Sequence, residues 1–115
     1  MAGPLSGYKI IEIAGIGPGP FAAMLLSDMG AEVILVDRAQ AVRGPAPDTA
    51  AGDISLRGRK NIALDLKNAD DRELFLKLLD DANVLVENFR PGTLERLDLH
   101  PDMLIARNPK LVVVR

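Results

Sequence analysis

The sequence predicts an α/β fold with an open, mostly parallel β-sheet and flanking helices. Short apolar segments rich in β-branched residues alternate with helix-like segments along the whole chain. A glycine-rich turn at residues 15–19 connects the first apolar segment to the first helix-like segment. The second apolar segment, residues 31–37, lacks the polar–apolar alternation of a half-exposed strand, which is typical of a strand covered on both faces. With 115 residues, the chain is expected to form one domain around a single core.

The first half of the chain predicts a strand, a helix, a second strand and a long loop. Residues 8–14 are rich in isoleucine and read as a buried strand. Pro20 suits the first turn of the helix, where a missing N–H group has no cost, and Gly30 is suited to ending it. Residues 31–37 form the second predicted strand. Residues 39–58 are rich in proline, glycine and small residues, and a loop of this length is often functional or disordered.

The second half predicts three more strands and further helical segments. The strands are expected at residues 61–65, 84–87 and 111–114, and short helical turns at 93–97 and 101–107. A longer helix is expected at residues 70–82, capped by Asn68 or Asp70. Its core-facing stripe is predicted to be Leu74, Phe75, Leu78, Leu79 and Ala82.

The carboxyl ends of the strands are the expected place for a ligand in such a sheet. Only Arg115 follows the last predicted strand, so the loop that should extend the site there is missing. We therefore expect the sequence to be the opening portion of a longer protein.

Composition excludes several classes of function. The net charge of −2 gives no support for nucleic acid or an anionic membrane as a partner. The chain has no cysteine, which excludes disulfides, zinc–thiolate sites and thiol nucleophiles. No apolar segment approaches the ~18 residues that a membrane span needs. The first residues show no basic stretch followed by an apolar one, so no signal peptide is predicted. The expected location is the cytoplasm, or an organelle lumen reached by another signal.

The glycine-rich turn partly matches a dinucleotide-binding motif. Residues 17–22 satisfy the pattern G-x-G-x-x-G/A, and Asp37 lies near the distance along the chain expected for a ribose-binding acid. A dinucleotide turn holds the pyrophosphate with backbone N–H groups, however, and Pro18 and Pro20 each remove one of these donors. The prolines argue against an NAD site, while a rigid turn that binds no ligand remains open.

Basic residues gather near the ends of the predicted strands. Arg38 directly follows the second strand, where a guanidinium can stack on an adenine or pair with a phosphate. The other cations near strand ends are Arg57, Arg59, Lys60, Lys67, Arg90 and Arg96. Each alone is typical of a solvated surface, but together they indicate an anionic ligand such as a nucleotide or a phosphorylated cofactor.

No set of residues predicts catalysis or metal binding. His100 is the only histidine, which excludes a two-histidine metal site and argues against a catalytic triad. The serines lie in no nucleophile-elbow pattern. Glu12 and Glu87, which lie within or at the end of predicted strands, are the carboxylates expected to be committed to structure. The sequence thus contains no credible acid/base pair, and we assign no catalytic residue.

Several separate motifs, in the same order, resemble those of one protein family. They are PLSG at 4–7, EIAGIGPGPFAAM at 12–24, DMGAEVILVDR at 28–38, GRKNIALDLK at 58–67 and VENFRPG at 86–92. Over essentially its whole length, the sequence resembles the family III CoA transferases, and within them the α-methylacyl-CoA racemases. Such proteins have a Rossmann-like large domain, a small domain and two interlocked chains. The resemblance implies that residues 1–115 are the CoA-binding N-terminal portion, without the catalytic segment or the small domain.

The resemblance also implies where CoA would bind, as part of an acyl-CoA substrate rather than as a tightly bound cofactor. Arg38 would lie against the adenine or its phosphates, and Gly17 and Pro18 would pass close to the cofactor. The nucleotide pocket would be lined by Leu64, Asp65, Leu66 and Lys67. The next contact region would contain Asn88, Phe89, Arg90 and Arg96.

Three functions remain open at this point. A racemase would epimerise 2-methyl-branched acyl-CoA thioesters by removing and returning the α-proton with a histidine and an aspartate. A transferase would move CoA between carboxylic acids with an aspartate nucleophile. In both cases the reacting residues would follow the fifth strand, so residues 1–115 alone are expected to be inactive. A non-catalytic nucleotide-binding module is the third alternative.

Overall fold

The computed structural model describes residues 3–38 and 54–115, which form a five-stranded, entirely parallel sheet. The strands are β1 (Lys9–Ile13), β2 (Glu32–Arg38), β3 (Arg59–Leu64), β4 (Val84–Val86) and β5 (Val112–Val114). Their order is β3-β2-β1-β4-β5, so the direction of winding reverses between β1 and β4. This is the order of a doubly wound sheet, which places ligands at the carboxyl ends of the strands beside the reversal point. The α/β class and the parallel sheet are confirmed.

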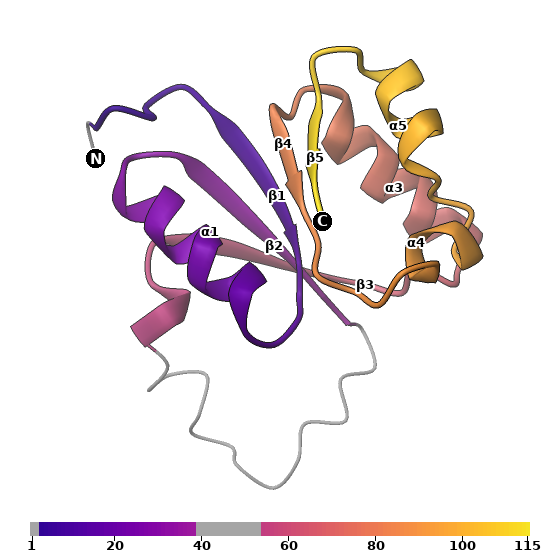
Figure 1. Cartoon of the computed structure of the whole chain (residues 1–115), viewed down its shortest axis with the longest axis horizontal. Helices are drawn as coiled ribbons and strands as arrows, with labels where there is room; N and C mark the ends of the chain where they lie inside the picture. Colours follow the sequence, from indigo (N-terminus) through magenta and orange to yellow (C-terminus); the bar gives the residue numbers. More distant parts are fainter. Residues whose placement is uncertain (1–2, 39–53) are drawn as a thin grey trace, which may run out of the picture.

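Helices cover both faces of the sheet (Figure 1). One face carries α1 (Pro18–Asp28), with the short 3₁₀ helix η1 (Ile54–Leu56) beside it. The other carries α3 (Ala69–Asp80), α4 (Thr93–Arg96) and α5 (Pro101–Arg107). Residues 39–53, most of the predicted long loop, lie outside the described residues. Where that loop was expected to continue to residue 58, η1 forms instead.

Alternate side chains of β1 build the two halves of the core. Ile10 packs on the α1 side in a cluster with Ala23 and Val33. Ile11 and Ile13 face the other way, into the larger cluster that contains Phe75 of α3 and Leu104 of α5. Strand residues therefore point alternately to two covered faces, as a buried parallel sheet requires.

The helix α1 begins two residues earlier than the sequence indicates. Its first helical residue is Pro18, preceded by Gly17 with φ of +91°. Both prolines lie in the first turn, where an N–H group would have no partner within the helix. The predicted stop is confirmed, because Gly30 adopts φ of +100° after the helix ends.

The helix α3 has the predicted cap but a narrower buried stripe. The Asn68 side chain accepts hydrogen bonds from the N–H groups of Asp70 (2.9 Å) and Asp71 (3.1 Å). Phe75 and Leu79 are buried, but Leu74 is 42% exposed and does not belong to the core. The sheet and α5 cover only one side of α3. The predicted stripe is wider than this covered side, so Leu74 at its edge stays exposed.

Candidate functional site

A pocket of about 580 Å³ opens at the carboxyl ends of the strands, where the topology predicts a ligand. Its first wall comes from the ends of β1 and β2, its second from the turn after β3, and its third from the segment after β4. The lining residues are Ile13, Ala14, Val36, Asp37, Arg38, Leu64, Asp65, Leu66, Lys67, Phe89, Arg90, Thr93 and Leu97.

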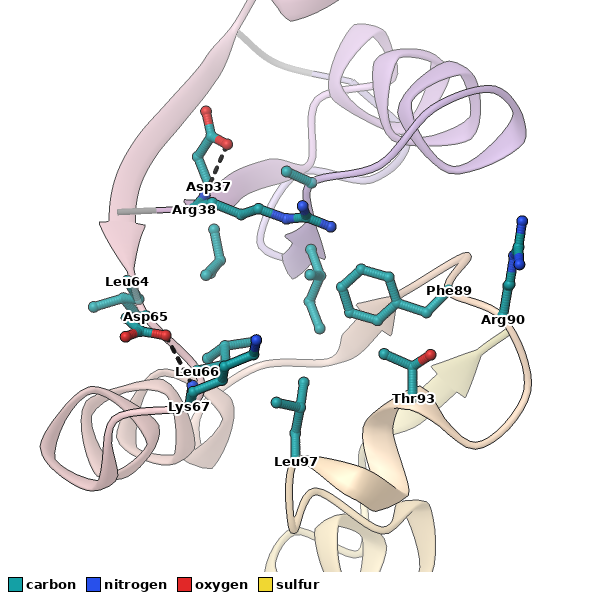
Figure 2. A pocket seen from close by; sticks show the side chains of 13 residues that line it. Asp37, Arg38, Leu64, Asp65, Leu66, Lys67, Phe89, Arg90, Thr93 and Leu97 are labelled. Atoms are coloured by element: carbon teal, nitrogen blue, oxygen red, sulfur yellow. Dashed lines mark hydrogen bonds between the residues drawn. The ribbon is translucent and has the colours of Figure 1, made fainter. Parts of the chain in front are cut away.

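The polar groups of the pocket converge from different walls (Figure 2). The Arg38 side chain extends across the pocket from the end of β2, and the Lys67 amine points into it from the turn after β3. The Phe89 ring faces the same space, while Arg90 stands at the rim. Within residues 3–38 and 54–115, neither Arg38 nor Lys67 forms an ion pair, so both positive charges are available to a ligand.

The turn after β3 is held in place by side chains of α3 and of the turn itself. Asp71 accepts a hydrogen bond from the backbone N–H of Asp65 (2.8 Å), and Asp65 accepts one from the N–H of Lys67 (3.0 Å). The Arg72 guanidinium donates to the carbonyl oxygens of Leu66 and Lys67, each at 3.3 Å. The backbone that carries Lys67 is thus positioned before any ligand arrives.

The structure brings most of the predicted contact residues together. Arg38, Phe89 and Arg90 line the same pocket as the predicted run from Leu64 to Lys67. Gly17 and Pro18 begin α1 and do not line it. Arg96 also lies outside the pocket lining and donates to the Thr93 hydroxyl (3.1 Å). Contact between these three residues and a ligand stays a prediction.

Asn88 joins the two segments that meet at the reversal point of the sheet. Its side-chain amide donates to the carbonyl oxygen of Ile16 at 2.6 Å. A Cβ atom at Gly15 or Gly19 would collide with the Asn88 side chain. Gly15 and Gly19 therefore allow the first turn and the start of α1 to lie close to the segment after β4. A direct role of Asn88 towards a ligand stays a prediction.

The cations that begin β3 do not belong to the pocket, and the expectation that they join an anion site is wrong. Arg57 pairs with Asp28 at 2.6 Å, and Lys60 pairs with Glu32 at 3.1 Å. Arg59 pairs with Glu12 at 2.7 Å beneath α1. These residues lie before β3 or in its first half, whereas the pocket is formed where the strand ends.

The Glu12–Arg59 pair is almost completely buried, with side-chain exposures of 0% and 2%. Arg59 also donates to the carbonyl oxygens of Pro20 (2.6 Å) and Ser55 (2.7 Å), so it connects β1 to α1 and to η1. Burial raises the pKa of Glu12 to about 7, against the opposing effect of Arg59. The structural commitment predicted for Glu12 is confirmed.

Several pocket residues were missed by the sequence analysis. Ala14 follows β1 directly, so the rule that ligands lie at strand ends could have identified it. Thr93 and Leu97 enter the pocket because α4 turns back beside the strand ends, and no local sequence pattern encodes that path.

The remaining chemistry-bearing groups are few. His100 is exposed, precedes α5 and does not line the pocket. The residues described by the structure contain no cluster of three or more histidine, cysteine or acidic side chains able to hold a metal ion. None of the helices within residues 3–38 and 54–115 has the length and apolar character that a membrane span requires.

Comparison with known proteins identifies the family. The sequence matches the model of CoA-transferase family III over residues 5–115. The chain belongs to CoA-transferase family III. The match confirms the resemblance seen in the sequence motifs.

Relatives named as a racemase and as a CoA-transferase are similar to this chain. The alpha-methylacyl-CoA racemase of Mus musculus is 38% identical over 96% of this chain and 27% of its own length. The succinyl-CoA–L-malate CoA-transferase alpha subunit of Chloroflexus aurantiacus is 37% identical, covering 97% of this chain and 28% of its own. The chain thus spans less than a third of the length of these relatives.

A solved structure confirms the fold. The crystal structure of a CAIB/BAIF family protein from Brucella suis superimposes with a TM-score of 0.85 at 32% identity. The match covers 98% of this chain and 33% of the other. The chain therefore matches about a third of that larger protein.

Proposed function

We propose that residues 1–115 form the CoA-binding portion of an α-methylacyl-CoA racemase-like enzyme. The observation that supports this most strongly is the pocket at the strand ends, where Arg38 and Lys67 lack carboxylate partners among the described residues. CoA carries an adenine, a diphosphate and a ribose 3′-phosphate, and such groups are commonly bound by guanidinium and ammonium side chains.

The pocket is suited to the adenosine end of CoA. Its volume of about 580 Å³ is typical of a small-molecule site. The Arg38 guanidinium can stack on the adenine or pair with a phosphate, and Lys67 supplies a second charge from the opposite wall. Phe89 and Leu97 offer apolar surface to the base.

In the racemase reaction, the thioester carbonyl acidifies the α-proton, and a positioned acid/base pair removes and returns it. The described residues bind and orient the substrate through its CoA end. We place the acid/base pair outside residues 1–115 in the full natural chain, since these residues contain no candidate pair. We further propose that the full enzyme is cytoplasmic and forms an interlocked homodimer.

A CoA transferase is the second candidate, because relatives named as racemase and as CoA-transferase are similarly identical to this chain. Deuterium exchange at the α-carbon separates the two reactions. A racemase in D₂O should incorporate deuterium into a 2-methylacyl-CoA without an acceptor acid, whereas a transferase should instead move CoA to an added carboxylate. A full natural chain with neither activity that still bound CoA would be a binding module.

We predict that the full natural chain binds CoA more tightly than NAD. In the first turn of α1 the prolines leave few N–H donors, and the Phe21 N–H is already bonded to the Gly17 carbonyl (3.3 Å). A pyrophosphate bound in the NAD manner would lack its donors. Isothermal titration calorimetry with both ligands measures the preference, and tighter binding of NAD would overturn the proposal.

Replacement of Arg38 by alanine is expected to weaken CoA binding by about 1–3 kcal/mol, the range for a charge-assisted contact. Arg57→Ala is the matched control, because it removes an exposed arginine that pairs with Asp28 and lies outside the pocket lining. Calorimetry should show a loss of affinity only for Arg38→Ala. Unchanged affinity in that variant would remove Arg38 from the binding site.

A further inference from the structure

One wall of the pocket lacks the support of regular secondary structure. The segment between β4 and α4 carries Phe89 and Arg90, and it lies outside the paired strands. The helix α4 has only four residues, and its N-cap is Gly92, without a side-chain cap. A single helical turn is unstable by itself, so this wall depends on tertiary contacts.

Arg115 links the three segments that meet behind this wall. Its Nε donates to Glu87 Oε1 at 2.7 Å, and its two terminal nitrogens donate to the Glu95 carboxylate at 2.8 and 3.2 Å. Glu87 directly follows β4, Glu95 lies on α4, and Arg115 directly follows β5. We call these residues the Arg115 clamp.

The clamp extends to the pocket through Glu87. The second oxygen of Glu87 accepts a hydrogen bond from the backbone N–H of Phe89 at 2.8 Å. The Glu87 side chain is 1% exposed, so protein groups rather than water must satisfy its carboxylate oxygens. The hydrogen bond from Arg115 lowers the pKa of Glu95. One guanidinium therefore holds two carboxylates, one bonded to the backbone at Phe89 and the other on α4.

We propose that Arg115 is a positioning residue for CoA binding: through Glu87 and Glu95 it holds the wall that presents Phe89, Arg90 and Thr93 to the ligand. The inference rests on the proposed binding of CoA in this pocket. Arg115 itself does not line the pocket, so it acts through the segment between β4 and α4, which it holds by its bonds to Glu87 and Glu95.

Two variants separate geometry from charge in the full natural chain. Arg115→Lys keeps the net charge but cannot bond two carboxylates with the planar geometry of a guanidinium. Glu95→Ala cuts the tie to α4 and also removes a negative charge, which by electrostatics alone would strengthen binding of an anionic ligand. Each variant is expected to weaken CoA binding roughly 3- to 10-fold through lost preorganisation.

The matched control is Arg107→Lys. Arg107 also bonds a carboxylate through two nitrogens, to Asp80 at 2.7 and 3.0 Å, and its side-chain exposure of 34% is close to the 38% of Arg115. Its ion pair joins α5 to α3 without contributing to the pocket lining. The control should bind CoA as the wild type does, because neither Arg107 nor its carboxylate partner Asp80 lines the pocket and the Asp80 side chain is itself 46% exposed.

Calorimetric titration with CoA tests the proposal. If the wild type does not bind CoA, the proposed function fails. If the wild type binds CoA and Glu95→Ala binds equally or more tightly, the positioning role is wrong. Should Arg115→Lys not fold, Glu95→Ala decides alone, because it leaves the buried Glu87 paired with Arg115.

Discussion

Replacement of Arg59 by alanine is expected to lower the free energy of unfolding by about 3–5 kcal/mol, the range for breaking a buried ion pair by removing one partner. The variant leaves Glu12 fully buried without its cation. It also releases the carbonyl oxygens of Pro20 and Ser55, which Arg59 binds at 2.6 and 2.7 Å. Equilibrium urea unfolding of the full natural chain, followed by far-UV circular dichroism, measures the loss.

Lys60→Ala is the matched control for this prediction. Lys60 is the next residue on β3 and pairs with Glu32 at 3.1 Å, but its side chain is exposed. Removing an exposed ion pair should change stability by less than about 1 kcal/mol. If Arg59→Ala has no larger effect than Lys60→Ala, the buried pair does not hold α1 on the sheet.

A double replacement shows whether the charges themselves are needed. Glu12→Leu together with Arg59→Met substitutes apolar groups for both partners, which in buried pairs is often neutral or stabilising. We expect the double variant to recover much of the stability lost in Arg59→Ala. Its CoA affinity should equal that of the wild type, because neither residue lines the pocket.

The order and type of the elements followed from sequence because their signals are local. Apolar runs rich in β-branched residues marked the strands, and Asn68 and Gly30 acted at helix ends as their chemistry predicts. The place of the pocket also followed, because ligands lie at the carboxyl ends of parallel strands. Arg38 and Lys67 could be placed there because each lies at or just after the end of a strand.

The errors arise where contacts join distant parts of the chain. Arg59 was grouped with Lys67 because both lie near an end of the same strand, but opposite ends of a strand lie at opposite edges of the sheet. The partner of Arg59 is 47 residues away in sequence. Asn88 bonds Ile16 across 72 residues, and Thr93 reaches the pocket through the path of α4. No local periodicity carries such information.

The free energy of unfolding of the wild type, measured relative to that of Glu12→Gln, is expected to fall as the pH rises from about 4.5 to 7. Burial raises the pKa of Glu12 from 4.5 to about 7, so in this range the folded chain retains a proton that the unfolded chain has released. Each rise in pH then favours unfolding. The contribution is fully present below pH 4.5 and is lost as the pH passes 7. It is on the order of 3 kcal/mol, because one pKa unit corresponds to about 1.4 kcal/mol.

The control variant Asp28→Asn should show no comparable slope between pH 5 and 8. The hydrogen bond from Arg57 lowers the pKa of Asp28, so its stabilising contribution is present above the ordinary aspartate pKa of 3.8 and is lost as the pH falls. Urea unfolding of wild type and both variants at pH 4, 5, 6, 7 and 8 compares the pH dependence of the two stability differences. A flat difference between wild type and Glu12→Gln over this range would show that Glu12 stays ionised beside Arg59 even at pH 5. The pair would then act as a permanent ion pair, and its contribution to folding would be independent of pH near neutrality.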